Sequence, residues 1–392
     1  MTPHRGPQTP PTALWDDCRD AALYVHVPFC TRKCPYCAFY SIPLDDTSLC
    51  RKYLEALDME IAQATRCRCI RTVYVGGGTP TALDAASLEL LMGTIRGALQ
   101  ESPEEWTCEA NPESLDGDKA ALLAAAGVDR ISIGAQTFDP DGLRTLGRRH
   151  GAADTRRAVE ACRRAGIENV SLDLMYGYPG SSLPRIEQDI RNLMALAPAH
   201  VSVYALSVEP GTPLDRMVQR REIELPGDES HALQYELLRR RLAEGGYRQY
   251  ELSNFALPGY RCRHNWTYWS GGQYIGCGPG AHSFSGGKRW WNPPDLVRWC
   301  TSVLESGRPQ IEFDEHLSSE KRARELLVVA LRRSEGVNRG WFRTLTGFDY
   351  RQLCAPVVRQ LCDLGLLTDQ GDRLRLTEKA YFVSDAVFRE LI

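Results

Sequence analysis

Short apolar runs alternate with segments of helical periodicity over the first half of the chain. The runs end in Gly, Pro or polar residues, as strands do, and they occupy 22–27, 72–75, 106–110, 130–134, 169–174 and 201–206. The segments between them predict helices at 48–66, 86–99, 117–126, 154–165 and 185–196. Such alternation favours parallel strands joined by right-handed crossovers. We therefore expect an α/β fold, an incomplete TIM-like (βα)6 barrel over residues 21–225.

The remaining sequence predicts two further units and a disordered start. An amphipathic helix at 228–245 ends at a Gly pair and leads into a Gly- and aromatic-rich stretch, so 226–308 is interpreted as an extension that covers the barrel. Helical runs at 319–333 and 350–364, with the β-like RLRLT, predict a small winged-helix-like domain over 309–392. The proline-containing residues 1–20 are expected to be disordered.

Composition narrows the function classes. The chain has 392 residues, of which 43% are hydrophobic and 25% charged, and its net charge is −3. No strong basic field is available, so nucleic acid is not expected as a partner. The start resembles neither a signal peptide nor a membrane span, so we expect a cytoplasmic protein with reduced cysteines, a few of which bind metal.

Three cysteines follow the first predicted strand within LYVHVPFCTRKCPYCAFY. Cys30, Cys34 and Cys37 lie in a loop, because Pro28 and Pro35 argue against an uninterrupted helix. A cubane iron–sulfur cluster normally takes four thiolates, so three of them imply one iron with a non-protein ligand. Zinc is the alternative, although structural zinc sites usually pair two CxxC-like knuckles and no suitable second knuckle is found. The spacing favours a [4Fe–4S] cluster.

Polar residues follow the ends of the next strands. The GGGTP sequence, with Gly77, Gly78 and Thr79, lets a ligand approach the backbone, and its amides are expected to be free to donate. Glu109, Gln136 and Asp173 end three later strands and should lie at the same mouth of the barrel. Each of the three could instead be a buried polar group that a neighbouring amide satisfies.

The CxxxCxxC loop with an aromatic before the last Cys resembles the signature of the radical S-adenosylmethionine (SAM) superfamily. This resemblance implies that SAM chelates the open iron and that one electron from the cluster cleaves it into methionine and a 5′-deoxyadenosyl radical. The cofactor would then supply the difficult chemistry.

The order of CxxxCxxC, GGGTP, ExNP, GxQ, LGRRH and DLxYGxP is similar to that of the oxygen-independent coproporphyrinogen III oxidase (HemN-like) group. The resemblance covers roughly residues 20–290. It implies that SAM is contacted by these residues: Tyr24, Tyr36, Gly77, Gly78, Thr79, Glu109, Gln136, Arg148 and Asp173.

Two departures favour the haem-chaperone branch of that group. The oxidases carry a fourth cysteine two positions after the third, whereas this chain has Phe39. RHNWTYW resembles the HNxxYW motif of the chaperone branch, in which His264 is the candidate haem ligand. Further haem-binding candidates are Asn265, Tyr268, Trp269 and His282, the last with Cys277 nearby. A packed core histidine with aromatic neighbours is the simpler alternative.

The expected function is therefore a haem chaperone with a [4Fe–4S] cluster, SAM and haem, which passes haem to acceptor proteins such as membrane-bound respiratory enzymes. An electron donor to the cluster is a further expected partner. Alternatives are an oxygen-independent coproporphyrinogen III oxidase, a related radical SAM methyltransferase or haem-degrading enzyme, and a zinc or interaction protein.

Overall fold

A computed structural model describes residues 20–392. The predicted disordered segment 1–20 lies outside the described residues, apart from Asp20, which begins β1 (Asp20–Val27). No helix within residues 20–392 combines the length and the apolar character needed to cross a membrane.

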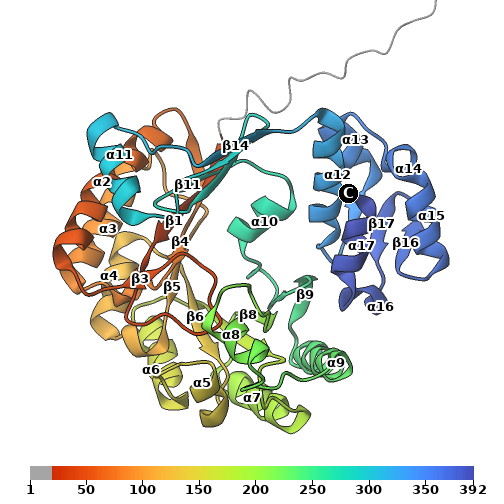
Figure 1. The fold of residues 1–392 in the computed structure, drawn as a ribbon, viewed down its shortest axis with the longest axis horizontal. Coiled ribbons are helices and arrows are strands. Elements are labelled where there is room, and N and C mark those ends of the chain that lie inside the picture. Colours follow the sequence, from red (N-terminus) through yellow and green to blue (C-terminus); the bar gives the residue numbers. More distant parts are fainter. Residues whose placement is uncertain (1–19) are drawn as a thin grey trace, which may run out of the picture.

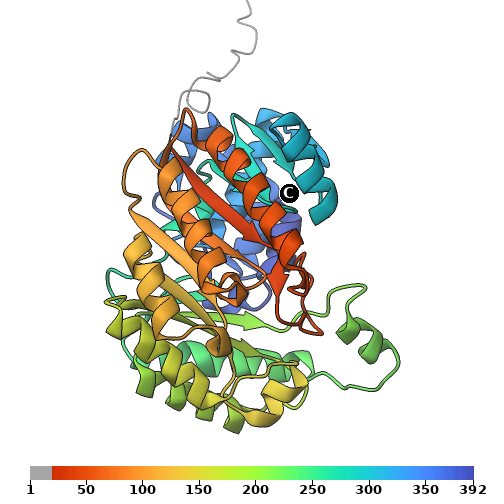
Figure 2. The same cartoon turned by 90° about the vertical axis from the view of Figure 1, so that its left-hand side faces the viewer.

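Six parallel strands form the predicted incomplete barrel, and helices cover its outer face (Figures 1 and 2). The strands after β1 are β4 (Cys69–Gly77), β5 (Glu105–Ala110), β6 (Arg130–Gln136), β7 (Asn169–Tyr176) and β8 (His200–Ala205). The crossover helices are α2 (Thr47–Thr65), α3 (Ala85–Ala98), α4 (Gly117–Ala126), α6 (Ala152–Arg164) and α7 (Leu183–Leu196). The fold class expected from the sequence is confirmed.

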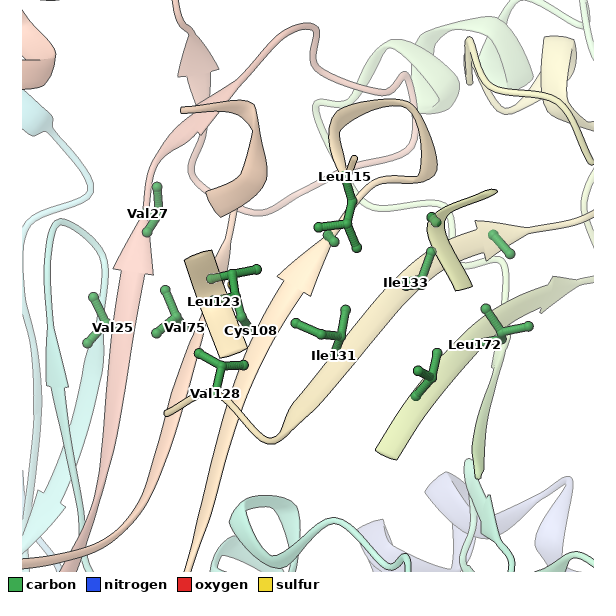
Figure 3. Packing of buried hydrophobic residues seen from close by; sticks show 14 of the residues in the cluster. Val25, Val27, Val75, Cys108, Leu115, Leu123, Val128, Ile131, Ile133 and Leu172 are labelled. Atoms are coloured by element: carbon green, nitrogen blue, oxygen red, sulfur yellow. The ribbon is translucent and has the colours of Figure 1, made fainter. Parts of the chain in front are cut away.

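Successive residues of each barrel strand face opposite sides of the sheet, one side packed against the helices and the other lining the barrel interior. Figure 3 shows apolar side chains of neighbouring strands, Val25, Val75, Cys108 and Ile131, packed with Leu123 of α4, and all five are fully buried. Burying an aliphatic side chain of this size stabilises the fold by roughly 1.5–3 kcal/mol. Because strand residues alternate between faces, the intervening polar residues face the barrel interior.

The extension is built into the sheet, where a covering element was expected. The strand order is β14-β13-β12-β11-β1-β4-β5-β6-β7-β8-β10-β9, and β11 pairs with β1 in parallel. The added strands are β9 (Arg248–Glu251), β10 (Asn254–Ala256), β11 (Tyr274–Cys277), β12 (His282–Ser285), β13 (Lys288–Trp291) and β14 (Phe313–His316). The helices of the extension are α9 (Asp228–Glu244), α10 (Arg263–Trp269) and α11 (Leu296–Ser306). Two further helices belong to the barrel region: the short α5 (Pro140–Thr145) precedes α6, and α8 (Pro213–Gln219) follows β8.

The C-terminal unit has its own core and lies across from the open side of the barrel, with α10 between them (Figure 1). A three-stranded antiparallel sheet, β15 (Val337–Asn338), β17 (Arg373–Leu376) and β16 (Leu367–Gln370), packs with helices, as expected for a winged-helix-like unit. The helices are α12 (Ser319–Leu331), α13 (Arg339–Thr346), α14 (Tyr350–Leu353), α15 (Ala355–Asp363), α16 (Glu378–Tyr381) and α17 (Ser384–Leu391).

The prediction of one continuous helix at 350–364 is wrong, because two helices, α14 and α15, occupy this stretch. The chain leaves helical geometry at Cys354, which ends α14 and precedes α15. Pro356 lies in the first turn of α15, where its missing amide donor does no harm, whereas inside a continuous helix it would remove a hydrogen bond.

Candidate functional site

The cysteine loop closes on itself at the end of β1. Cys30 ends the two-residue strand β2 (Phe29–Cys30), which pairs with β3 (Ile42–Pro43) on the far side of the loop. The Cys37 amide donates to the Cys34 carbonyl at 3.2 Å. All three cysteines are partly exposed. The loop therefore presents three accessible thiols from one short segment.

Two polar side chains reach the cysteine sulfurs. Thr79 Oγ1 lies 3.7 Å from Cys30 Sγ, and Arg148 Nη1 lies 3.6 Å from Cys34 Sγ. Burial raises the pKa of the Cys30 and Cys37 thiols, so cluster binding, which needs thiolates, should release protons. No three His, Cys, Asp or Glu side chains within residues 20–392 gather closely enough for a single metal ion. A cubane differs, since its thiolates bind separate irons.

The backbone amides of the glycine motif are hydrogen-bonded within the protein. The amides of Gly77, Gly78 and Thr79 donate to Glu109 Oε2, the Val27 carbonyl and the Phe29 carbonyl. The expectation of free amides is therefore wrong. Gly77 has φ of +109°, and a Cβ on Gly78 would lie 2.5 Å from the Phe29 carbonyl oxygen, so both positions require glycine.

Glu109 lies in the barrel interior beside a residue that the sequence reasoning missed. Its Oε1 accepts a hydrogen bond from Tyr74 Oη at 2.8 Å, and its Oε2 accepts from the Gly77 amide at 3.1 Å. Burial raises the pKa of Glu109 to about 7. Tyr74 lies two residues before Gly76 on β4, and residues two apart on a strand point to the same face. This spacing is the signal that could have identified Tyr74.

Arg148 joins the cysteine loop to the strand ends. Its Nη2 donates to Asn111 Oδ1 at 2.6 Å and to the Gly134 carbonyl at 2.8 Å, while its buried Nε has no partner among the described residues. Gln136, at the end of β6, has φ of +63°, an unusual conformation for a non-glycine residue that often marks functional sites.

The other predicted SAM contacts are spread over the same interior. Asp173 accepts from Ser132 Oγ at 3.1 Å, and burial raises the pKa of its carboxyl. Tyr36 lies between two of the cysteines in the loop, and burial raises its pKa. Tyr24 Oη is 3.0 Å from His26 Nδ1, and the other ring nitrogen of His26 is 2.8 Å from the Tyr40 carbonyl. That carbonyl can only accept, so Nε2 carries the proton and Tyr24 donates to Nδ1.

His264 is a core residue in this structure. It is 1% exposed, its Nδ1 is 2.9 Å from Thr72 Oγ1, and its Nε2 is 2.8 Å from Tyr268 Oη. Burial and the Arg130 charge lower its pKa to about 3, which keeps the ring neutral. Freeing a nitrogen for iron would leave a buried hydroxyl unpaired, at a cost of about 1–3 kcal/mol. The structure therefore does not place His264 to ligate haem iron.

A cavity lies between the barrel mouth and α12. It has a volume of about 980 Å³, at the upper end of the usual range for ligand pockets. Much of its wall is aromatic or aliphatic. The lining residues are Tyr24, His26, Lys33, Ala38, Phe39, Tyr40, Tyr268, Trp269, Gly271, Gly272, Tyr274, Gly280, His282, Phe284, Arg289, Pro294, Arg322, Glu325, Leu326 and Val329.

Three of the five haem candidates line this cavity: Tyr268, Trp269 and His282. His282 is exposed, and its ring nitrogens have no hydrogen-bond partner among residues 20–392. Its ring stacks on Trp291 with centroids 5.0 Å apart, and Trp291 stacks on Phe313 at 4.1 Å. Asn265 and Cys277 do not line the cavity. Sequence reasoning missed Trp291, Arg289 and Arg322, which lie on short strands and a helix outside the motifs.

Two family models match the chain: the Radical SAM superfamily over residues 24–220 and the HemN C-terminal domain over residues 317–383. The haem chaperone HemW of Bacillus subtilis is 36% identical over 377 residues, which are 94% of this chain and 98% of that protein. The chain belongs to the HemW family of the radical SAM superfamily. HemW of Escherichia coli is 35% identical over 91% of this chain and 94% of its own length.

A solved structure supports the fold. Coproporphyrinogen III oxidase (HemN) of E. coli superposes with a TM-score of 0.84 at 21% identity, covering 97% of this chain and 92% of that one. At this identity the likeness concerns the fold.

The residues around the cysteine loop fit the cofactors of the superfamily. The three thiols match a [4Fe–4S] cluster with one iron open to SAM. Arg148 brings a positive charge and a buried, unpaired N–H to that side of the loop, and Glu109 brings a carboxyl group that is negative once ionised. These opposite charges suit the carboxylate and amino groups of SAM.

Proposed function

We propose that this chain is a haem chaperone, which binds haem in the cavity between the barrel and α12 and passes it to acceptor proteins. The relatives that match it over nearly their whole length are haem chaperones. The cavity is the observation that carries the proposal, because it combines flat aromatic faces with an accessible imidazole.

His282 is the proposed iron ligand. Imidazole is a common axial ligand of haem iron, and this ring is the one in the cavity wall without a protein hydrogen bond among residues 20–392. Burial lowers the pKa of His282, so the neutral form that binds iron dominates at neutral pH. The stacked Trp291 supports the ring from behind.

Basic side chains in the cavity wall suit the two propionates of haem. Lys33 lies on the cysteine loop, Arg289 on β13 and Arg322 on α12, so they approach the cavity from three segments. Arg322 lies over the Phe284 ring at 4.7 Å, and Arg289 forms an ion pair with Glu325. Guanidinium groups bind carboxylates with paired hydrogen bonds.

The cysteine loop and the haem cavity share one wall. Tyr24, a predicted SAM contact, lines the cavity, and Phe39, two positions after Cys37, is 68% exposed beside it. When bound, the cluster supplies one electron for reductive cleavage of SAM. The proposed partners are an electron donor to the cluster and haem acceptors such as membrane-bound respiratory enzymes.

The test is an anaerobic haem titration of the reconstituted protein, with a parallel assay of coproporphyrinogen III decarboxylation. Saturable, stoichiometric haem binding without decarboxylation supports the chaperone. Decarboxylation without haem binding would overturn the proposal and assign the chain an oxidase activity.

A further inference from the structure

His264 lies at the junction of three parts of the molecule. Its backbone amide donates to Glu105 Oε1 at the start of β5, and its ring nitrogens lie against Thr72 of β4 and Tyr268 of its own helix. The ring also packs 5.2 Å from the Tyr74 ring, whose hydroxyl donates to Glu109. One imidazole therefore contacts both a cavity-lining tyrosine and the tyrosine that holds the SAM-side carboxylate.

Tyr268 is the part of this arrangement that faces the cavity. Its ring makes edge contacts with His264 at 5.1 Å and with Tyr274, another lining residue, at 4.7 Å. The hydrogen bond between the Tyr268 hydroxyl and His264 Nε2 fixes the orientation of the Tyr268 ring, because the side chain has only two torsion angles and its one polar group is held. Deleting the imidazole would free the ring to turn into or out of the cavity.

We propose that His264 is a positioning residue for haem binding, which orients Tyr268 in the cavity wall and does not ligate the iron. This proposal rests on the proposed haem site and deepens it. It accounts for a histidine that belongs to a haem-chaperone motif and yet lies in the core. The division of labour is that His282 binds iron and His264 shapes the wall.

A second buried histidine supplies a matched control. His200 is also fully buried between two hydroxyls, with Nδ1 2.8 Å from Ser171 Oγ and Nε2 2.8 Å from Tyr250 Oη. Neither His200 nor Ser171 lines the cavity. His200→Gln and Ser171→Ala thus remove the same kind of bond outside the cavity wall. Tyr250 is unsuitable, because its hydroxyl also accepts from the Cys262 amide at the start of α10.

The experiment measures haem affinity and iron-ligation spectra for His264→Gln, Tyr268→Phe and the double variant, beside the two controls. We expect His264→Gln and Tyr268→Phe each to weaken haem binding about fivefold, the loss that corresponds to one hydrogen bond. The double variant should lose little more, because both single changes break one contact. The ligation spectrum should stay as in the wild type, and the controls should keep wild-type affinity.

Two results would overturn the proposal: a changed ligation spectrum in His264→Gln with an unchanged one in His282→Ala, or unaltered haem affinity in both His264→Gln and Tyr268→Phe. The same double-mutant cycle on unfolding free energy, without haem, tests the contact itself. If the wild type binds no haem, the proposed function fails, while a coupling in that cycle would still show that His264 holds Tyr268.

Discussion

The barrel mouth and the cavity beside it are built on different principles. At the mouth, polar groups are already paired with the protein: Glu109 accepts two hydrogen bonds, and Arg148 reaches Cys34, Asn111 and Gly134. In the cavity wall, Tyr268 and Tyr274 meet edge to face. The imidazole of His282 is exposed there, with Trp291 stacked behind it. The mouth suits a small charged ligand in one fixed pose, and the cavity suits a broad flat ligand.

This difference predicts how each region responds to substitution. A preorganised polar site loses function when one group is removed, since the partners left behind are buried and unpaired. In an aromatic wall, each substitution removes the contact area of one ring and leaves the other rings in place, because each ring contributes separately. Changes at the mouth should therefore give complete losses, and changes in the cavity should give graded ones.

The largest effect is expected from removing the cluster ligands. Replacing Cys30, Cys34 and Cys37 together by Ala should abolish the brown iron–sulfur absorbance after anaerobic reconstitution. Haem affinity should remain near that of the wild type, because the cavity wall contains none of the three thiols. Cys67→Ala, at an exposed cysteine outside the loop, is the control. Loss of haem binding in the triple variant would mean that the two regions are not separate.

The next effect is expected at the proposed iron ligand. His282→Ala should weaken haem binding roughly 100-fold or more, since losing a direct ligand costs at least as much as losing an outer-shell partner of a metal. It should also change the ligation spectrum, while cluster assembly stays intact. His316→Ala, an exposed histidine on β14 outside the cavity, should behave as the wild type. A wild-type spectrum in His282→Ala would remove this residue from the site.

A smaller loss of haem affinity is expected at Trp291, which stacks on the proposed iron ligand. Trp291→Ala should weaken haem binding about tenfold, because His282 loses the ring that stacks on it and holds its orientation. Trp291→Phe should restore most of it. Neither Trp291 nor its neighbour Trp290 lines the cavity, but Trp290 lies on the opposite face of β13 and does not stack on His282, so Trp290→Ala should leave haem affinity unchanged. Equal losses in Trp290→Ala and Trp291→Ala would indicate a general disturbance of the sheet.

The same two regions differ in how much of them the sequence reveals. The six barrel strands and the cysteine loop were predicted, because alternating apolar runs and close cysteine spacing are local signals. β11 to β14 were missed, since four-residue strands among glycines leave too short a pattern. The cavity wall is made of segments far apart in the sequence, so Arg289 and Arg322 had no local signal. For His264, the motif predicted a haem ligand, and it gave no sign that the ring lies in the core between Thr72 and Tyr268.

The smallest effect concerns stability and is expected at Glu60, which ties the barrel to the segment that carries His282. Its Oε2 accepts from the Gly278 amide at 2.7 Å, and its Oε1 accepts from Asn292 Nδ2 at 2.8 Å. Burial raises its pKa to about 7. Between the usual carboxyl pKa, about 4.3, and pH 7, the folded state therefore holds a proton that the unfolded state has released.

Stability from Glu60 consequently falls as pH rises through this window, by about 3 kcal/mol at most. We expect Glu60→Gln to remove that fall, which urea unfolding at several pH values would measure as a flatter dependence of the unfolding free energy on pH. The buried His264, with its lowered pKa, acts with the opposite sign in both proteins, so the difference between them isolates Glu60. An identical pH dependence in the two proteins would show that Glu60 is ionised when buried, and the two regions would then be linked by a carboxylate held by its donors alone.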